Sequence, residues 1–535
     1  MSTADSTSAT GVLASSDDRL PKEVKQVGVV VVLGTIMAIL DTTIVAVALA
    51  TLARDFHTSI TTIQWVTTGY LLALAVVIPL SGWAVHRFGA KPVYIVSLAL
   101  FITGSALCGL AWSAGVLVAF RVLQGLGGGM IMPVGQTIMA RTAGPDKMNK
   151  VMALIGVPTL LGPILGPVLG GLIVSNFSWR WIFFINVPIG IVALILAFRF
   201  LPTAHGDRSH RLDVIGFLLL APGLSLLVYG LSEVGSEGGF SSRGVQLSLA
   251  VSVVLIFGFV LRSLRAPEPL LDLRLFKRFN FTMASVCIFL VGATLYGTMF
   301  LLPLYYEIVR GESAWKAGLL MAPQGIGAAL VMRTSAKMAD KYGTRRTVPV
   351  GMALLALGTL AYTQVSGSTS YAFLAIALFV RGIGLGFGMM PVFAAAYQGL
   401  SHEEVPRAST STNIIRQIGG SIGVAVFAVV LQHAITDQFP HHAPSLGAMP
   451  STALPVTIVD RLASAFATSF WWSFAVCAIA IVPAIFLPGP LKVGPGVLHE
   501  LESAEAVNLD EVAEIIPEQR LTRNRTTATG HHRAT

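Results

Sequence analysis

Long apolar runs, separated by short polar or charged turns, cover most of this chain. Each run is about 17–25 residues long, the length that an α-helix needs to cross the hydrocarbon layer of a membrane. A spanning segment must satisfy its own backbone, so continuous apolar runs are helices, whereas barrel strands alternate over about 10 residues. The pattern predicts an all-α polytopic membrane protein with fourteen transmembrane helices. We place them at 27–50, 62–83, 93–111, 114–140, 151–174, 181–201, 212–233, 244–263, 281–304, 316–338, 347–364, 371–398, 412–434 and 463–487.

Composition supports a membrane environment. The 535 residues are 54% hydrophobic and only 12% charged, whereas soluble domains carry about 25% charged residues. With the N-terminus inside, the inner loops and N-terminal tail hold 21 Lys and Arg and the outer loops six, counting the last three residues of each helix beside a loop. Positive residues favour the cytoplasmic side, so both termini are predicted to be cytoplasmic in a multi-pass protein of the inner (cytoplasmic) membrane. The net charge of +9 is thus explained by topology, and its dispersal over short loops argues against nucleic-acid binding.

Two distant parts of the chain resemble each other. GWAVHRFGAKP (82–92) and AKMADKYGTRR (336–346) each follow an apolar run, and RVLQGLGGGMIMP (121–133) pairs with RGIGLGFGMMP (381–391). Duplicated halves are typical of secondary transporters, which place the substrate at the interface between the repeats. The predicted organisation is a cytoplasmic tail, a six-helix half, two inserted helices, a second six-helix half and a cytoplasmic tail. Their ranges are 1–26, 27–201, 202–265, 266–490 and 491–535.

Ionisable residues deep in the membrane are costly and mark functional sites. Asp41 is the acidic residue nearest the middle of a predicted helix, and Arg121 lies at a matching depth, about 12–14 Å below the outer surface at 1.5 Å per residue. A carboxylate at this depth is either paired or protonated, as a proton-coupling site requires. The alternative is a permanent structural ion pair. Arg381 is also deep, and Arg416 is interpreted as fixing its helix by hydrogen bonds near the cytoplasmic side.

The chain has no enzyme signature. It contains no Walker A sequence, and its membrane His and Cys residues lack the spacing of a metal site. We therefore predict a protein that is not an enzyme and has no cofactor or metal, and that takes its energy from the proton gradient.

Six segments in the same order resemble the major facilitator superfamily, specifically its fourteen-helix drug:proton antiporter branch of the EmrB/QacA type. They are LDTTIVAVALA (40–50), GWAVHRFGAKP, RVLQGLGGG, GPILGPVLGG (162–171), WRWIFFINVPIG (179–190) and PLLDLRLFKRFNF (269–281). The resemblance covers roughly residues 27–490. It implies proton coupling at Asp41 and Arg121 and an exporter rather than an importer.

The resemblance also implies two motifs. A conformational-switch loop corresponds to Gly82, His86, Arg87, Gly89 and Lys91, with Asp340 in the second copy; His86 stands where the family usually has an acid. An antiporter motif corresponds to Gly162, Pro163, Gly166, Pro167, Gly170 and Gly171. The glycines of this motif recur every four residues and form a stripe that permits close helix packing.

The predicted function is proton-coupled multidrug efflux by alternating access, with lipophilic small molecules, protons and membrane lipid as partners. Scarce membrane acids favour neutral or singly charged compounds over dications. The alternatives are export of an endogenous lipid, siderophore or metabolite, and a non-transporting sensor or scaffold. The sequence leaves an accessory periplasmic partner open. The polar or aromatic candidates for the substrate cavity are Trp65, Tyr70, Gln136, Tyr296, Gln324, Tyr397 and Asn413.

Overall fold

The computed structural model describes residues 20–144, 147–203, 206–207, 211–236, 242–401, 403–439 and 455–489. These residues form helices joined by turns, and no strand occurs among them. The predicted C-terminal tail lies outside the described residues, as does the predicted N-terminal tail up to residue 19.

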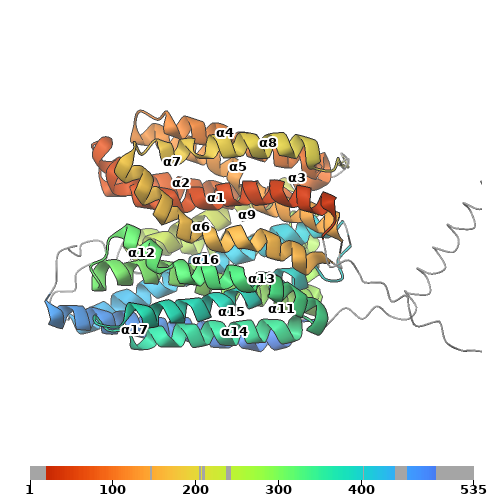
Figure 1. Ribbon diagram of the computed structural model, residues 1–535. Helices are drawn as coiled ribbons and strands as arrows, with labels where there is room; N and C mark the ends of the chain where they lie inside the picture. Colours follow the sequence, from red (N-terminus) through yellow and green to blue (C-terminus); the bar gives the residue numbers. More distant parts are fainter. Residues whose placement is uncertain are drawn as a thin grey trace, which may run out of the picture. The chain divides into compact units, whose positions relative to one another are not determined.

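The first group of helices is formed by the N-terminal part of the chain (Figure 1). Its members are α1 (Lys22–Asp55), α2 (Ile60–Val77), α3 (Leu80–Phe88), α4 (Ala90–Gly109), α5 (Ala114–Ala143), α6 (Met148–Asn176), α7 (Trp181–Phe184) and α8 (Asn186–Phe200). Two predicted helices are broken by proline. Pro79 separates α2 from α3 with a bend of 52°. Pro188 lacks the N–H that would bond to the carbonyl of Phe184, which interrupts the helix at Ile185. The backbone of Ile185 stays helical, so α7 and α8 together form one span, Trp181–Phe200.

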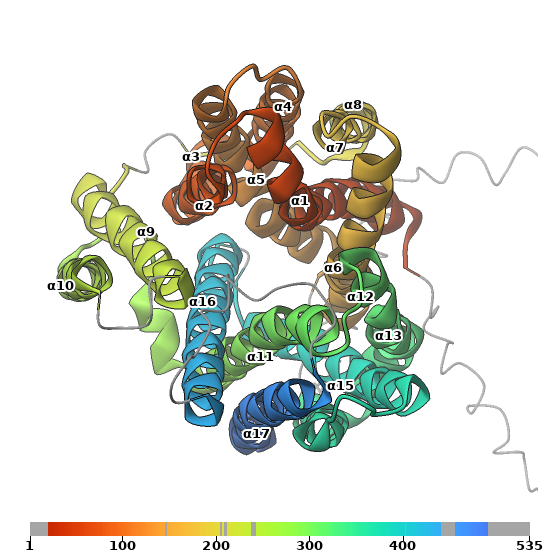
Figure 2. The same ribbon diagram turned by 90° about the vertical axis from the view of Figure 1, so that its left-hand side faces the viewer.

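The second group of helices is formed by the C-terminal part of the chain. It contains α11 (Phe279–Leu304), α12 (Ala314–Leu320), α13 (Ala322–Tyr342), α14 (Thr344–Leu360), α15 (Tyr371–Tyr397), α16 (Val405–Gln438) and α17 (Val456–Ile485). Short η2 (Leu273–Lys277), η3 (Tyr305–Val309) and η4 (Ala361–Gln364) flank α11 and α14. The two groups lie against each other along several helices, with α6 next to α12, α13 and α15, and α16 next to α3 and α5. Figure 2 shows α6 beside α12 where the groups meet.

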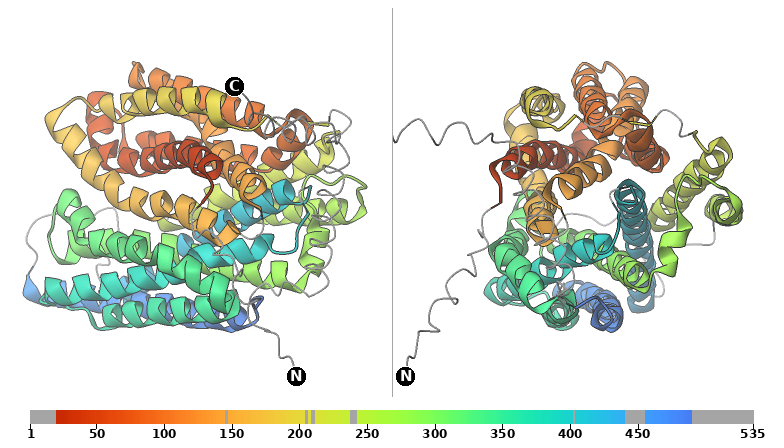
Figure 3. Two further views of the ribbon diagram at one scale, coloured as in Figure 1. Left: turned by 45° about the vertical axis from the view of Figure 1, so that its right-hand side comes forward. Right: turned by 90° about the vertical axis from the view of Figure 1, so that its right-hand side faces the viewer.

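A pair of helices stands outside both groups. α9 (Val214–Ser236) and α10 (Arg243–Arg265) pack mainly on each other, and α9 also contacts α2 of the first group and α16 of the second. Figure 3 shows this pair at one side of the two groups. α9 therefore lies along the boundary between the groups.

The repeated turns have the same backbone conformation. Gly89 ends α3 and precedes α4 with φ +86°, and Gly343 ends α13 and precedes α14 with φ +82°. In each turn the glycine N–H donates to a carbonyl at 2.9 Å, that of Val85 or Ala339. Positive φ favours glycine, which explains why this residue recurs in both sequence copies.

Within the described residues, eleven helices are long and apolar enough to cross a membrane, and twelve if the bent α2–α3 pair is one span. The all-helical membrane fold is thus confirmed, whereas the count of fourteen stays a prediction. The helices α6 and α13, with 29 and 21 residues, are the two further long segments in the predicted set.

Candidate functional site

A buried ion pair lies inside the first group of helices. Nη1 of Arg121, on α5, donates to Oδ2 of Asp41, on α1, at 2.5 Å, and both side chains are 0% exposed. Two neutral amides complete the carboxylate's hydrogen bonds. Nε2 of Gln124 and Nδ2 of Asn186 donate to Oδ1 of Asp41 at 2.8 and 3.1 Å. A charge pair inside a low-dielectric region is tolerated when its remaining donors and acceptors are satisfied in this way.

Further contacts hold the guanidinium in place. Nε of Arg121 donates to the carbonyl of Val66 at 3.2 Å, and Nη1 also donates to Oε1 of Gln124 at 2.8 Å. The ring of Tyr70 lies under the guanidinium, with 4.1 Å between Cζ and the ring centroid. Helices α1, α2, α5 and α8 therefore meet at this pair.

The amide partners were not singled out from the sequence. Gln124 follows Arg121 by three residues and so shares its helix face. Asn186 stands in the segment WRWIFFINVPIG, where a polar residue in an apolar run was the available signal. Asn186 also donates to Oγ of Ser105 at 3.1 Å, which links the site to α4.

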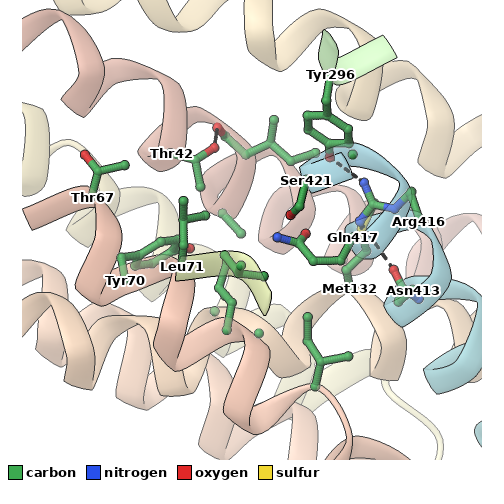
Figure 4. A pocket seen from close by; sticks show the side chains of 18 of the residues that line it. Thr42, Thr67, Tyr70, Leu71, Met132, Tyr296, Asn413, Arg416, Gln417 and Ser421 are labelled. Atoms are coloured by element: carbon green, nitrogen blue, oxygen red, sulfur yellow. Dashed lines mark hydrogen bonds between the residues drawn. The ribbon is translucent and has the colours of Figure 1, made fainter. Parts of the chain in front are cut away.

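A cavity of about 380 Å³ lies between the two groups of helices. Its lining comes from α1, α2, α5, α9, α11 and α16, and Arg121 forms part of the wall while Asp41 lies behind it. Figure 4 shows the polar side chains Thr42, Thr67, Gln417 and Ser421 around this space. A volume of this size lies in the range of about 300–1,000 Å³ that is typical of small-molecule pockets.

Three of the seven cavity candidates line this space, namely Tyr70, Tyr296 and Asn413. Trp65 instead stacks on Tyr229, with 5.9 Å between ring centroids, and is 43% exposed. The remaining three candidates, Gln136, Tyr397 and Gln324, belong to two polar networks outside the cavity lining.

The first network joins the two groups of helices beside the cavity. Oε1 of Gln136, on α5, accepts from Nδ2 of Asn413 at 2.7 Å, from Oγ of Ser409 at 3.3 Å and from Oη of Tyr397 at 3.4 Å. Ser409 and Asn413 belong to α16, and Tyr397 belongs to α15. These buried hydrogen bonds cross from one half of the chain to the other.

The second network surrounds Arg381 on α15. Its three nitrogens donate to Oε1 of Gln324 at 2.5 Å, Oγ1 of Thr298 at 2.7 Å and Oγ1 of Thr359 at 3.1 Å. Arg381 occupies the repeat position of Arg121 and is 1% exposed, but its side-chain partners here are neutral. The two repeats have therefore diverged, with an acid present beside one buried arginine only.

Arg416 lines the cavity from α16. Its Nη1 donates to Oη of Tyr296 at 2.7 Å, and its Nη2 lies 3.0 Å from Sδ of Met132 and 3.4 Å from Oδ1 of Asn413. The sequence placed Arg416 near the cytoplasmic side and gave no reason to include it among the cavity residues. The approach of α11 and α5 to α16 is what places it in the cavity wall (Figure 4).

The loop motif lies where the two groups touch. Gly82 is buried in α3, and a Cβ at this position would lie 3.0 Å from Oγ1 of Thr410 on α16. The neighbouring Ser81 hydroxyl bonds to that of Thr410 at 2.9 Å. In the second repeat, Asp340 accepts from Nδ2 of Asn149, on α6, at 2.6 Å.

Other residues of the loop motif stay within the first half or near α9. Nζ of Lys91 donates to the carbonyls of Phe198 and Leu201, both at 2.9 Å. Arg87 places its guanidinium 5.8 Å from the ring centroid of Phe88. His86 lines a small pocket together with Arg211 and Asp213, which directly precede α9.

The glycine motif forms the contact between α6 and α1. Gly162, Gly166 and Gly170 are buried, and a Cβ on them would meet residues Ile39, Thr43 and Ile44 of α1 respectively. Gly171 faces Trp315 of α12 instead, and the described residues do not include the side chains of Pro163 and Pro167. This stripe therefore packs on the stretch of α1 that carries Asp41.

Two repeated groups of helices around a cavity, with the arginine of a buried ion pair in its wall, form the architecture of a secondary transporter. Residues 31–424 match the model of the Major Facilitator Superfamily. The chain belongs to this superfamily, as the sequence motifs predicted.

Individual relatives agree with this assignment. The chain is 37% identical over 499 residues to a multidrug resistance protein B homolog of Mycobacterium tuberculosis, covering 89% of this chain and 92% of that protein. It is 30% identical over 491 residues to the multidrug export protein EmrB of Escherichia coli, covering 87% and 95%. The solved proton:xylose symporter XylE has a TM-score of 0.60 at 12% identity, covering 87% and 96%, which indicates a shared fold.

Proposed function

We propose that the protein is a proton-coupled exporter of lipophilic small molecules. The observation that carries this proposal is the ion pair of Asp41 and Arg121, which is fully buried and adjoins the cavity between the two halves. Relatives named for multidrug resistance and export support the substrate class and the direction of transport.

Proton coupling follows from the chemistry of the pair. A proton on Asp41 removes the counter-ion of Arg121, and an unpaired buried charge costs about 3–5 kcal/mol. The helices around the pair must then rearrange, or Arg121 must find other acceptors. Because α6 packs on α1 at residues 39–44 and also contacts α13 and α15, a shift of α1 reaches the boundary between the halves.

The proposed organisation keeps the predicted topology. Adding α6 and α13 to the eleven apolar helices and the bent α2–α3 span gives fourteen crossings, with both termini in the cytoplasm. The two halves are 27–201 and 266–490, and 202–265 holds the inserted pair. Alternating access then requires the links between the halves, such as Ser81 with Thr410, to break and re-form.

The test is compound-driven proton flux. A resistance panel in a host without its own exporters selects a transported compound, and the full chain in liposomes with an internal pH dye then reports protons. We expect Asp41→Asn to abolish the flux because the amide cannot exchange a proton. Asp213→Asn is the matched control, since Asp213 is also a buried, paired acid, 3.3 Å from Nε of Arg262, but does not line the cavity. Full coupled export by Asp41→Asn would refute the proposal.

A further inference from the structure

Four residues of the cavity lining carry a buried donor atom without a hydrogen-bond partner among the described residues. Thr35 Oγ1, Thr67 Oγ1, Arg121 Nη2 and Arg416 Nε are buried and have no hydrogen-bond partner in the described part of the chain, and all four residues line this one space. Guanidinium nitrogens only donate, and hydroxyls can do so. Buried donors are normally satisfied, so this set indicates a site that is completed by water or by an acceptor-bearing ligand.

The charge of the lining has one sign. Arg121 is neutralised by Asp41 behind the wall, whereas the hydrogen-bond partners of Arg416 are Tyr296, Met132 and Asn413, all neutral. The described lining residues include no Asp, Glu, Lys or His. The cavity therefore holds one net positive charge without a counter-ion, and this charge lies on Arg416.

The remainder of the lining is mainly apolar, with Ile39, Leu71, Leu74, Leu295, Met299 and Val424 among its members. A ligand that matches both the apolar lining and the unpaired charge of Arg416 has an apolar body and a single acceptor group at one end. A volume of about 380 Å³ fits a small molecule with one ring system.

We infer that the transported compounds are lipophilic monoanions, such as aryl or alkyl carboxylates, whose anionic group binds Arg416 while the apolar body lies against the helices of the first half and α11. This inference deepens the proposed export function and rests on it. The sequence predicts neutral or singly charged substrates. The inference adds that the charge is negative and that Arg416 binds it.

The experiment compares three probes with one pyrene body, which are 1-pyrenebutyrate, 1-pyrenebutanol and 1-pyrenebutylamine. Binding to the full chain in a neutral detergent is measured by fluorescence titration, with partition into empty micelles subtracted. We expect affinity to fall from anion to alcohol to ammonium. Arg416→Gln should weaken pyrenebutyrate about 10- to 100-fold, as for a lost charge-assisted hydrogen bond, and leave pyrenebutanol nearly unchanged.

Two further variants separate charge from folding. Arg416→Lys keeps the positive charge and should keep the preference for the anion, which also tests the inference if the Gln variant does not fold. Arg333→Gln removes an exposed arginine of α13 outside the cavity and should leave all three affinities unchanged. The inference is overturned if pyrenebutylamine binds most tightly, if the three probes bind with equal affinity, or if pyrenebutyrate shows no saturable binding. It is also overturned if folded Arg416→Gln keeps the full affinity for pyrenebutyrate.

The proposed function fails separately. Anion preference without proton-driven export in liposomes would refute the export function and leave the site assignment standing. Proton-driven export with no charge preference in binding would refute the anion site and leave the export function standing.

Discussion

Three buried or half-buried arginines of this protein have three different environments. Arg121 has a carboxylate, Arg381 has a neutral amide and two hydroxyls, and Arg416 has neutral partners and faces the cavity. All three are taken as charged, because a guanidinium is not deprotonated in proteins. The first is therefore suited to switching through its acid, the second to holding helices together and the third to attracting a ligand.

The contribution of Arg381 to the stability of the fold can be tested directly. Arg381→Lys keeps the charge but loses the directed fork that reaches Gln324, Thr298 and Thr359 at once. We expect a loss of about 1–3 kcal/mol of stability from buried acceptors left unsatisfied, measured as a lower unfolding temperature in detergent.

The exposed Arg333 provides the comparison for this substitution. Arg333→Lys should change the stability by less than about 0.5 kcal/mol, as is usual for surface positions. An Arg381→Lys variant as stable as Arg333→Lys would show that the three hydrogen bonds do not contribute to folding.

At the scale of elements, the contact between α6 and α1 links the glycine motif to the ion pair. Residues 39–44 of α1 fit against Gly162, Gly166 and Gly170, and Asp41 lies within this stretch. Close approach of two helices in a membrane depends on such small residues. A helix with bulkier residues at these positions would hold α1 away from α6 and so disturb the position of Asp41.

A single methyl group tests this packing. Gly166→Ala places a Cβ against the side chain of Thr43, so we expect overpacking to cost about 1–3 kcal/mol and to slow export. Stability is measured by thermal unfolding and export with the selected compound in liposomes.

The matched control is Gly258→Ala on α10, where the nearest atom, Cδ2 of Leu219, would lie 3.5 Å from the new Cβ. That substitution should be neutral or stabilising, since alanine is the better helix former by about 1 kcal/mol. Equal behaviour of the two variants would mean that α6 does not need its close contact with α1.

At the scale of the whole transporter, hydrogen bonds join the two halves beside and beyond the cavity. Ser81 bonds to Thr410, Asn149 to Asp340, and Gln136 to residues of α15 and α16. If the halves rock as proposed, these contacts break in each transport cycle. They are few and polar, so exchange with water or other partners makes their rupture inexpensive.

A reversible cross-link tests the motion. Ser81→Cys combined with Thr410→Cys places two thiols where hydroxyl oxygens now lie 2.9 Å apart. Oxidation should join α3 to α16 and stop export in liposomes, and a reductant should restore it. Each single variant, treated in the same way, should keep its rate. Undiminished export by a fully cross-linked protein, as verified by peptide mass spectrometry, would contradict alternating access between these halves.

The amino-acid sequence alone was sufficient for the features that depend on each segment separately. Apolar runs predicted helices, and the proline positions explain their breaks at Pro79 and Ile185. The repeated glycines and motif order predicted the superfamily. These predictions succeed because burial in lipid and backbone hydrogen bonding act on a helix before it meets any partner.

Only the tertiary structure decided which polar residues meet. Asn186 joins Asp41 across 145 positions of sequence, and Arg416 reaches Met132 across 284. Gln324 belongs to the Arg381 network rather than to the cavity. Periodicity assigns a side chain to a face of its own helix, but the partner of that face is set by the packing of distant helices. The sequence therefore determined the membrane helices and the family, and the folded arrangement determined the cavity and the charge that it presents.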